Sequence, residues 1–497
     1  MTCASLCSTR RSVRLVLSSS LLALAGCTVG PKYKPPVTAA PPAFKEVGPQ
    51  ISPDGTLWKV ATPQDAASRG KWWQMYEEPE LNGLEEKLNA SNQTIVQSYQ
   101  NFMAARALVR QARSNYFPTV TTTPSYTRTR TSASLAGPQV PASSLTSNSF
   151  DLPFDVSWEP DVWGRVRNTV RQYASQAQAS AADLANVKLS EQANLAVDYF
   201  ETRGQDSLIA LYERTVEAYR KSLELTRTLH DTGIDDAQSV AQANLNLQTA
   251  ESSLINLRIA RAQYEHAIAV LVGEPASSFS LPVRELTTAA PIIPPGVPSE
   301  ILERRPDIAE AERTMAAANA LIGVQTAAFY PSFSISAEGG FQTNKISNWL
   351  TWPSHFFSLG PSAAFTIFDA GARRSVLANY KAQYEADAAA YRQTVLAAFQ
   401  QTEDSLAAQR YLAEQLPQQQ GAVDAAQKYL DLANVRFRAG LDPYLDVYTA
   451  ETSLLQQQQT FINLRVSQMT SDVQLTEALG GGWNQVQLPS QKEVAAR

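Results

Sequence analysis

The sequence contains few of the residues that carry most enzyme chemistry. Its 497 residues include only three histidines, which lie far apart at His230, His266 and His355. It contains no H-E-x-x-H, C-x-x-C or G-x-S-x-G motif and no phosphate-binding loop, which are the local patterns of several large enzyme classes. These absences predict a protein that is not an enzyme and has no metal site.

Charged residues are also scarce, and acids outnumber bases. They make up 18% of the chain, below the roughly 25% that is usual in soluble domains. The formal net charge is -5, and loss of residues 1–26, which contain three arginines and no acid, would lower it to -8. This charge argues against nucleic acid as a partner.

Long apolar runs are missing from the mature part of the chain. No run of 18 or more apolar residues follows Cys27, whereas a membrane-spanning helix needs about 20. The apolar segment Leu15–Ala25 is shorter and follows three arginines. This arrangement predicts a secretory signal peptide at residues 1–26. If the mature protein crosses a membrane, it does so with strands.

The signal peptide leads into a Leu-Ala-Gly-Cys sequence that resembles a bacterial lipobox and ends at Cys27. Cys3 and Cys7 fall in the removed part, so Cys27 is the sole cysteine of the mature chain and is well suited to acylation. Thr28 follows instead of the Asp associated with inner-membrane retention, which favours the outer membrane. We expect diacylglycerol and palmitate on Cys27, an extended lipidated segment at 27–77 and no other cofactor. An ordinary signal peptide with an incidental cysteine is the alternative.

An internal duplication is the clearest positive signal. Three glycine-containing motifs of the first half recur in the second half, each 207 residues later. Three markers at one offset indicate that the chain consists of two copies of one unit. The paired glycines are Gly164 with Gly371, Gly233 with Gly440, and Gly273 with Gly480.

The duplication predicts the division of the chain. The units are a first repeat at 78–273, an equatorial linker at 274–302, a second repeat at 303–480 and a C-terminal tail at 481–497. Each repeat begins with a helical segment, near Pro79–Tyr116 and near Pro306–Tyr330. It continues with a β-hairpin at 119–162 or 332–369, a long helix at 164–232 or 371–439, and a last helix at 235–272 or 442–479.

The long segments are rich in good helix formers. At 1.5 Å per residue each would be about 100 Å long, which a compact globule cannot hold. The two shorter helices of a repeat, stacked end to end, would run beside its long helix. Their junction would form a belt at mid-height, where Gly204, Pro417 and Gly421 interrupt the long helices. Many alanines between 174 and 196 favour a curved wall, with a solid antiparallel coiled coil as the alternative.

The ends of the long helices carry turn signals. Gly233 and Gly440 are predicted to form hinge turns, because glycine tolerates the left-handed conformation that follows a helix. Asp235 and Asp442 would cap the next helices, with Pro443 at the first helical position.

The hairpin regions alternate apolar and polar residues. Along Phe150–Glu159, aromatic and aliphatic side chains share one face and acids share the other, and Phe333–Glu338, Phe357–Leu359 and Val120–Tyr126 repeat the pattern. This is typical of outer-membrane barrel strands, although a soluble sandwich alternates in the same way. Single-chain barrels start at eight strands. Four strands per chain would therefore require several chains to share one barrel.

Six further motifs span nearly the whole mature chain. They are Trp72-Trp73 with Pro79-Glu80-Leu81, Asn115-Tyr116-Phe117-Pro118, Glu159–Gly164, Leu302–Ile308, Phe329-Tyr330-Pro331 and Arg438-Ala439-Gly440. In this order they resemble the outer-membrane-factor family of tripartite efflux systems, the TolC-like lipoproteins of the NodT type. The resemblance implies a mixed α/β membrane protein. It would be a homotrimer with one 12-stranded β-barrel, continued by a long periplasmic α-helical barrel.

The resemblance also implies a gate at the turn around Gly440. Asp442 and Asp446 are four residues apart and share one face of the helix start, so threefold symmetry would place up to six carboxylates around an aperture. Rings of acids favour cations. Asp446 stands where relatives carry a constriction carboxylate, whereas Thr449 stands where several have a second acid. For Asp442, a role as a helix cap alone is the alternative.

The expected function is that of an outer-membrane exit duct. Drugs or other small toxic molecules would reach it from an inner-membrane RND-type transporter through a periplasmic adaptor protein. The protein would be anchored in outer-membrane lipid, with a large periplasmic portion. An exit duct for type I protein secretion and a lipid-anchored structural coiled coil of the periplasm are the alternatives.

Overall fold

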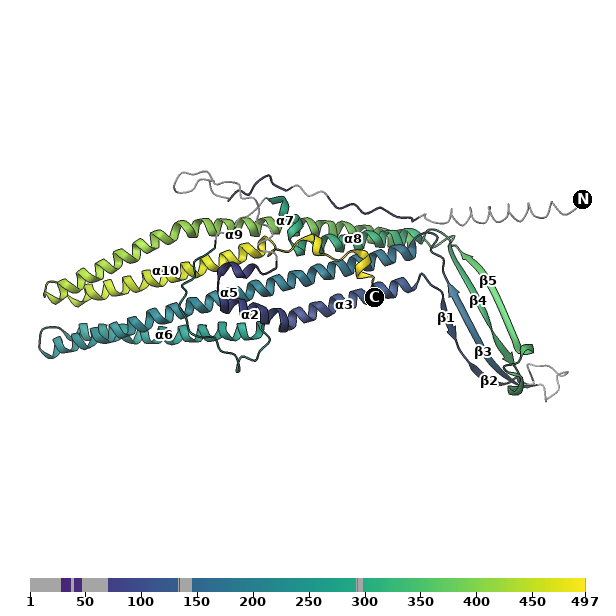
Figure 1. The fold of residues 1–497 in the computed structure, drawn as a ribbon, viewed down its shortest axis with the longest axis horizontal. Helices are drawn as coiled ribbons and strands as arrows, with labels where there is room; N and C mark the ends of the chain where they lie inside the picture. The colour runs from purple at the N-terminus through teal and green to yellow at the C-terminus, as the bar shows by residue number, and fades with distance from the viewer. Residues whose placement is uncertain are drawn as a thin grey trace, which may run out of the picture.

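The structure is a computed structural model that describes residues 28–36, 40–46, 70–132, 134, 145–291, 293 and 298–496. The chain is elongated, with helical hairpins at one end and an antiparallel sheet at the other (Figure 1). The predicted signal peptide at 1–26 and Cys27 lie outside the described residues. Within the described ranges, no helix is both long enough and apolar enough to span a membrane.

The main helices of the two repeats match in length. They are α3 (Gln93–Ser114) and α8 (Pro306–Ala327) with 22 residues each, α5 (Arg165–Asp231) and α9 (Ala372–Arg438) with 67 each, and α6 (Ala237–Leu271) and α10 (Tyr444–Ala478) with 35 each. The duplication recognised from glycines is therefore a duplication of whole helices.

Shorter elements lie at mid-height, in the hairpin tips and in the tail. They are η1 (Trp72–Tyr76), α2 (Pro79–Ser91), α7 (Pro298–Arg304), η3 (Ile346–Asn348), η4 (Trp352–Ser354), η5 (Gln485–Gln487) and α11 (Gln491–Val494). Where one helix is predicted near Pro79–Tyr116, the structure has two, because the chain breaks at Asn92 between α2 and α3.

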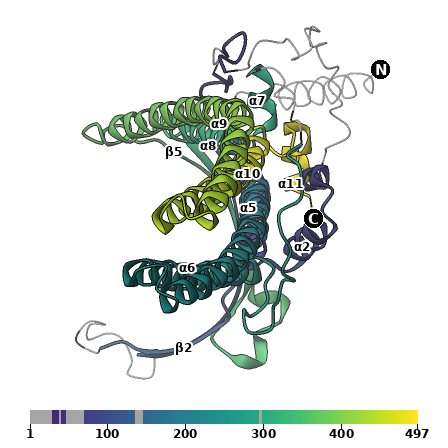
Figure 2. The same ribbon diagram turned by 90° about the vertical axis from the view of Figure 1, so that its left-hand side faces the viewer.

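The helices form a wall that is four helices wide. In the half near the sheet the order of contacts is α3, α5, α8 and α9, and in the half near the tip it is α6, α5, α10 and α9. Thus α6 continues α3 and α10 continues α8, which is the predicted end-to-end stacking. Figure 2 shows the wall as an open arc, with α2, α7 and α11 on its convex side. A solid bundle is therefore the wrong alternative for the single chain.

The expected interruptions of the long helices are wrong. Helix α5 runs through Gly204, and α9 runs through Pro417 and Gly421. A Cβ atom at Gly204 would lie 2.4 Å from Cγ2 of Val466, so glycine lets α10 approach α5 closely. Proline removes one helical hydrogen bond, which a 67-residue helix tolerates.

The stacked helices meet at two equivalent junctions. The Nδ2 atom of Asn92 donates to the carbonyl of Leu271 at the end of α6 (3.0 Å), and its Oδ1 atom caps α3. At the second junction, Nη1 of Arg305 donates to the carbonyl of Ala478 at the end of α10 (3.0 Å). Each side chain thus satisfies a carbonyl that a helix end leaves free.

The sheet is antiparallel throughout. Strands β1 (Thr119–Thr122) and β2 (Ser125–Arg130) pair with β3 (Thr146–Trp158), which pairs with β4 (Ser332–Thr343), which pairs with β5 (His355–Ala364). Residues opposite each other share a face. The register therefore collects on one face Val120, Tyr126, Phe150, Leu152, Phe154, Val156, Trp158, Ile335, Ala337, Gly339, Phe341, Phe357 and Leu359. The same face also carries Thr122 and, toward the hairpin tips, Arg128, Asn148, Thr343 and His355. The other face carries mostly serines, threonines and the acids Asp151, Asp155 and Glu338, together with Phe356.

The N-terminal segment packs along the second repeat. Tyr33 donates its hydroxyl proton to Oε1 of Glu312 on α8 (2.5 Å), and Phe44 is buried against α9. Both carboxylate oxygens of Glu403 on α9 accept backbone N–H groups, from Lys45 (2.8 Å) and Glu46 (3.0 Å). These contacts hold the segment to the helical wall.

Candidate functional site

Two turns of the same geometry close the helical hairpins at the tip. Gly233 has a φ of +77° and Gly440 a φ of +69°. The N–H of Ile234 donates to the carbonyl of Leu229 (2.8 Å), and the corresponding residue, Leu441, donates to Arg436 (3.0 Å). This bond, which reaches five residues back along the chain, defines a Schellman turn, which requires a left-handed residue at the glycine. The two predicted hinge turns thus end their helices in the same way.

The predicted capping roles of Asp235 and Asp442 are wrong. The residue that caps α6 is Asp236, whose Oδ1 atom accepts the N–H of Ser239 (2.8 Å). Pro443 occupies the cap position of α10 and the helix begins one residue later. In both turns the backbone needs one more residue to leave the left-handed glycine before the helix can start.

Asp442 instead forms an ion pair inside its own turn. Its carboxylate accepts two hydrogen bonds from Arg436, one from Nη2 at 2.7 Å and one from Nε. The hydrogen bond from Arg436 lowers the pKa of the Asp442 carboxyl. The pair therefore keeps Asp442 ionised and neutralises its charge locally.

Asp446 lies in the first turn of α10 and is half-buried. The pKa of Arg436 is raised, first by its hydrogen bond to Asp442 and to a smaller degree by the charge of Asp446. The hydroxyl of Thr449 donates to the carbonyl of Leu445 on its own helix (2.8 Å). Asp446 is thus the acid of this turn that Arg436 does not bind directly.

A tyrosine-rich seam between α5 and α10 supports the tip. The hydroxyl groups of Ser222 on α5 and Tyr444 on α10 are 2.8 Å apart. Tyr219 and Tyr444 are buried in the same cluster. Burial raises the pKa of the neighbouring Glu451 on α10 to about 7. Its Oε2 atom has no hydrogen-bond partner within the described ranges.

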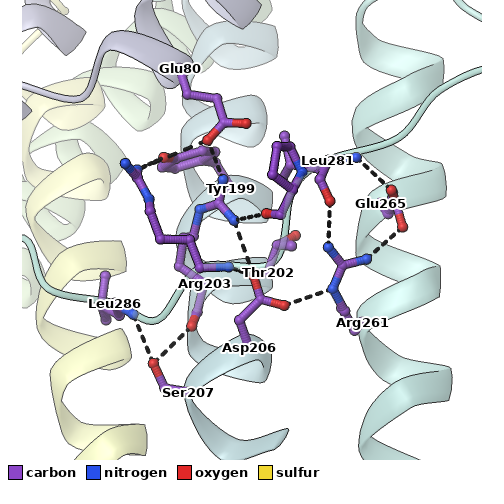
Figure 3. Close-up of polar contacts among 12 residues, drawn as sticks. Glu80, Tyr199, Thr202, Arg203, Asp206, Ser207, Arg261, Glu265, Leu281 and Leu286 are labelled. Carbon is purple, nitrogen blue, oxygen red and sulfur yellow. Dashed lines mark hydrogen bonds and ion pairs between the residues drawn. The ribbon is translucent and has the colours of Figure 1, made fainter. Parts of the chain in front are cut away.

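A buried ion cluster at mid-height is the feature that the sequence analysis missed (Figure 3). Asp206 on α5 accepts from Arg203 Nη1 (3.0 Å) and from Arg261 Nε on α6 (2.7 Å). The side chain of Asp206 is fully buried, and that of Arg203 is 2% exposed. Arg203 also pairs with Glu80 of α2, and Arg261 with Glu265 (2.6 Å). The sequence shows Arg203 with Asp206 and Arg261 with Glu265 at the spacing of neighbours on a helix. No local pattern in the sequence indicates that these two pairs meet.

This cluster holds the linker against the wall. Arg203 donates to the carbonyl of Pro282 (2.6 Å) and Arg261 to that of Leu281 (2.7 Å). In return, the backbone N–H of Arg284 donates to Asp206 (2.9 Å). The linker therefore donates a hydrogen bond to the buried Asp206 carboxylate, and these contacts hold it at the mid-height of the wall.

Known proteins are similar to this chain over most of its length. A model of the outer membrane efflux protein family matches the chain twice, over residues 84–274 and 297–481. The chain belongs to this family. It is 32% identical over 475 residues to the toluene efflux pump outer membrane protein TtgC of Pseudomonas putida, covering 94% of this chain and 95% of the relative. It is 28% identical to the pyoverdine export outer membrane protein OpmQ of Pseudomonas aeruginosa, over 87% of this chain and 91% of the relative.

Solved structures of efflux channels have the same fold. The outer-membrane channel OprN superposes with a TM-score of 0.83 at 29% identity and covers 92% of this chain and 100% of its own. The Campylobacter jejuni CmeC outer membrane channel has a TM-score of 0.83 at 21% identity, with coverage of 94% and 97%, which supports the fold alone. The predicted family, efflux function and outer-membrane location, with a large periplasmic helical portion, are confirmed.

Proposed function

We propose that three copies of this chain form the outer-membrane exit duct of a tripartite efflux pump. The duct passively conducts small toxic molecules that an inner-membrane RND-type transporter delivers through a periplasmic adaptor protein. The observation that carries this proposal is a sheet with one apolar and one polar face, joined to a curved helical wall (Figure 1, Figure 2). A lipid-facing exterior and a wet interior follow from those two faces.

The open edges of the sheet support the trimer. In the described chain, β5 pairs only with β4, and β1 and β2 pair only with β3. Unpaired backbone groups are costly in lipid, so a spanning sheet has to close on itself. Strands β1 and β2 follow each other along β3, so each chain contributes four strand positions. Three such sheets, edge to edge, would give the expected 12-stranded barrel. The helical wall has matching open edges, with α9 on one side and α3 and α6 on the other.

The substrate class follows from the relatives. TtgC is named for toluene efflux and OpmQ for pyoverdine export. Small organic molecules are therefore the proposed cargo, in preference to the secreted proteins of a type I system. A purely structural periplasmic coiled coil does not account for the two-faced sheet.

The lipid on Cys27 remains part of the proposal. The adjacent described residue, Thr28, packs at the start of α5, where a Cβ atom at Gly164 would lie 2.7 Å from its Cγ2 atom. This is where the sheet meets the helices, so a lipid attached next to it would lie close to the membrane surface.

The gate is proposed at the tip turn of the second repeat. Arg436 binds Asp442 within one chain, so Asp446 supplies most of the charge for a ring of carboxylates. Three copies of Asp446 around the threefold axis would bind divalent cations and hold the aperture narrow.

One experiment tests both duct and gate. The purified protein is inserted into planar lipid bilayers, and single-channel conductance is recorded with and without Mg²⁺. The wild type is expected to conduct weakly and to be blocked further by Mg²⁺. Asp446→Ala is expected to raise the conductance and weaken the block, whereas Asp442→Ala, the matched control, should retain the block. Absence of any conductance contradicts the duct, and unchanged conductance and block in Asp446→Ala contradict the gate.

A further inference from the structure

The end of the sheet that lies far from the helices carries basic residues and no acid (Figure 1). No Asp or Glu occurs in residues 119–150, which run from β1 to the start of β3, or in residues 339–368, which run from the middle of β4 past β5. The same two stretches contain Arg128, Arg130 and Lys345. The whole chain has a formal net charge of -5, so this end has the opposite sign.

The register places two of these cations on the apolar face of the sheet. Tyr126 lies opposite Phe150, and Phe150 lies opposite Thr343, so these residues form one row across β2, β3 and β4. Every second residue of a strand points to the same face. Arg128 and Arg130 therefore lie beyond this row on the apolar face. Charged side chains on a lipid-facing surface are tolerated only near the boundary of the hydrocarbon core.

Arg128 is part of a group of donors from neighbouring strands. Asn148 lies directly opposite it on β3, and the hydroxyl of Tyr126 donates to Oδ1 of Asn148 (3.2 Å). This hydrogen bond occupies the amide oxygen and leaves the Nδ2 group as a donor. Lys345 follows Thr343 at the end of β4. Strands β2 and β4 lie about 5 Å to either side of β3, so Arg128 and Lys345 flank Asn148.

The cations of this end have no acid to pair with. Arg128, Arg130 and Lys345 are exposed, and within the described ranges their side chains form no hydrogen bond and no ion pair. The hairpin segment 135–144, outside the described residues, contains no Asp or Glu. Neighbouring copies in a trimer would bring the same acid-free stretches to this height. Like charges that are gathered in this way repel each other unless an external anion lies among them.

Phosphate on a lipid is the anion that this position favours. Arginine and lysine are the usual ligands of phosphate in proteins. Free phosphate would gain nothing from the apolar face beside the cations, whereas a lipid can cover that face with its acyl chains. A phosphate monoester carries a charge of about -1.5 to -2 at pH 7, and a phosphodiester carries only one negative charge. Several cations per chain therefore favour a lipid with phosphate monoesters.

We propose that Arg128, Asn148 and Lys345 bind the phosphate monoesters of the phosphorylated glycolipid that forms the outer leaflet of the outer membrane. Arg130, two residues further from the membrane, adds a second arginine to each site. This inference rests on the proposed function, which turns this end of the sheet toward the cell exterior. It adds a ligand-binding site, with its residues and the chemistry of its ligand, to a part of the sheet that has no role in conduction.

Binding of lipid A to the full-length protein in mixed detergent micelles tests the site. The probes are diphosphoryl lipid A, the same lipid after removal of both phosphates, and phosphatidylglycerol, whose phosphate is a diester. The test variant is Arg128→Gln with Lys345→Gln. The matched control is Arg227→Gln with Lys428→Gln, which removes the same charge from exposed positions on α5 and α9. Bound lipid is counted by native mass spectrometry across a titration.

The wild type is expected to bind diphosphoryl lipid A more tightly than either of the other lipids. The test variant should bind it about 25-fold more weakly, at about fivefold for each basic side chain near an anionic lipid surface. The control variant should bind like the wild type. Arg128→Lys with Lys345→Arg keeps both charges and should also bind like the wild type.

Three results would overturn the inference. They are equal binding of diphosphoryl lipid A by the test and control variants, equal binding of all three lipids by the wild type, and displacement of lipid A by an equal concentration of inorganic phosphate. Conductance in planar bilayers separates these results from failure of the duct. The test variant should conduct as the wild type does, and a wild type that never conducts contradicts the duct and not the site.

Discussion

The attachment of the linker to the helical wall depends on the buried carboxylate of Asp206. The free energy lost when Asp206 is replaced follows from its contacts. Asp206→Ala leaves the guanidinium of Arg203, 2% exposed, without its nearest acid on the same helix. It also removes the acceptor of the Arg284 backbone N–H. Breaking a buried ion pair by deleting one partner costs about 3–5 kcal/mol. We expect the lower value, because the side chain of Arg261 is 13% exposed and can be hydrated.

Limited proteolysis with trypsin measures this cost locally. In the intact protein the linker has to open before the bond after Arg284 can be cleaved. Cleavage then follows the population of the open form. A loss of about 3 kcal/mol corresponds to a cleavage rate about 100-fold faster, at tenfold for every 1.4 kcal/mol. Far-UV circular dichroism should remain that of the wild type, since α5 and α6 keep their other contacts.

Glu213→Ala is the matched control, two helical turns further along α5. Glu213 pairs with Arg258 at 2.9 Å, but both side chains are more than half exposed. Such a pair contributes about 0–1 kcal/mol, so cleavage after Arg284 should accelerate by no more than about fivefold. If Asp206→Ala is cleaved no faster than Glu213→Ala, the ion cluster does not hold the linker.

Two further predictions concern the seam and the junction. Because the pKa of Glu451 in the folded protein, about 7, exceeds its ordinary value, folding stability should fall as pH rises from about 4.5 to about 7 and then level off. Glu451→Gln should raise the thermal midpoint at pH 8 and leave it unchanged at pH 4, with the exposed Glu224→Gln as control; an equal rise at both pH values would contradict the assignment. Gly480→Ala should destabilise the protein by at least about 1–2 kcal/mol, since its φ is +93° and its Cβ atom would collide with the carbonyl of Arg304. Gly421→Ala, inside α9 and in open space, should stabilise it by about 0.5–1 kcal/mol; the same sign for both variants in urea unfolding would count against this reasoning.

The repeat was accessible to sequence analysis because its markers obey a local rule. Gly233, Gly273, Gly440 and Gly480 all have positive φ, which few other residues adopt at low cost. Their spacing therefore fixed the lengths of the helices between them. The alternation of the strands was accessible for the same reason, since a period of two already sorts the side chains onto faces.

The details of the turns were not accessible, because two local rules competed. Asp442 precedes a proline near a helix start, which is the pattern of a cap. The structure pairs it with Arg436, six residues earlier, across a turn whose geometry brings the two side chains together. The choice between Asp235 and Asp236 as the cap depends on a single residue of register, which propensity does not resolve.

The ion cluster was hidden for a different reason, which is sequence distance. Arg203 and Asp206 form an ordinary helical pair until Arg261, on α6, and Arg284, in the linker, join them. These charges form a specific site only because they are buried together. Their burial depends on how the helices and the linker pack, which the local sequence does not show. The same applies to Arg305, which contacts the end of α10, 173 residues later in the chain.

The cluster also explains how a duplicated chain can have unequal halves. The positions 207 residues after Arg203 and Asp206 are Arg410 and Ala413, so the buried anion has no counterpart in the second repeat. A chain with two repeats has only one linker, and that linker covers the first repeat. On the second repeat the N-terminal segment takes its place, and Nη1 of Arg410 lies 3.8 Å from Oε2 of Glu46. Arg203 and Arg410, which occupy equivalent positions in the two repeats, thus bind two unrelated extended segments. The linker covers the middle of α5, and the N-terminal segment covers the middle of α9.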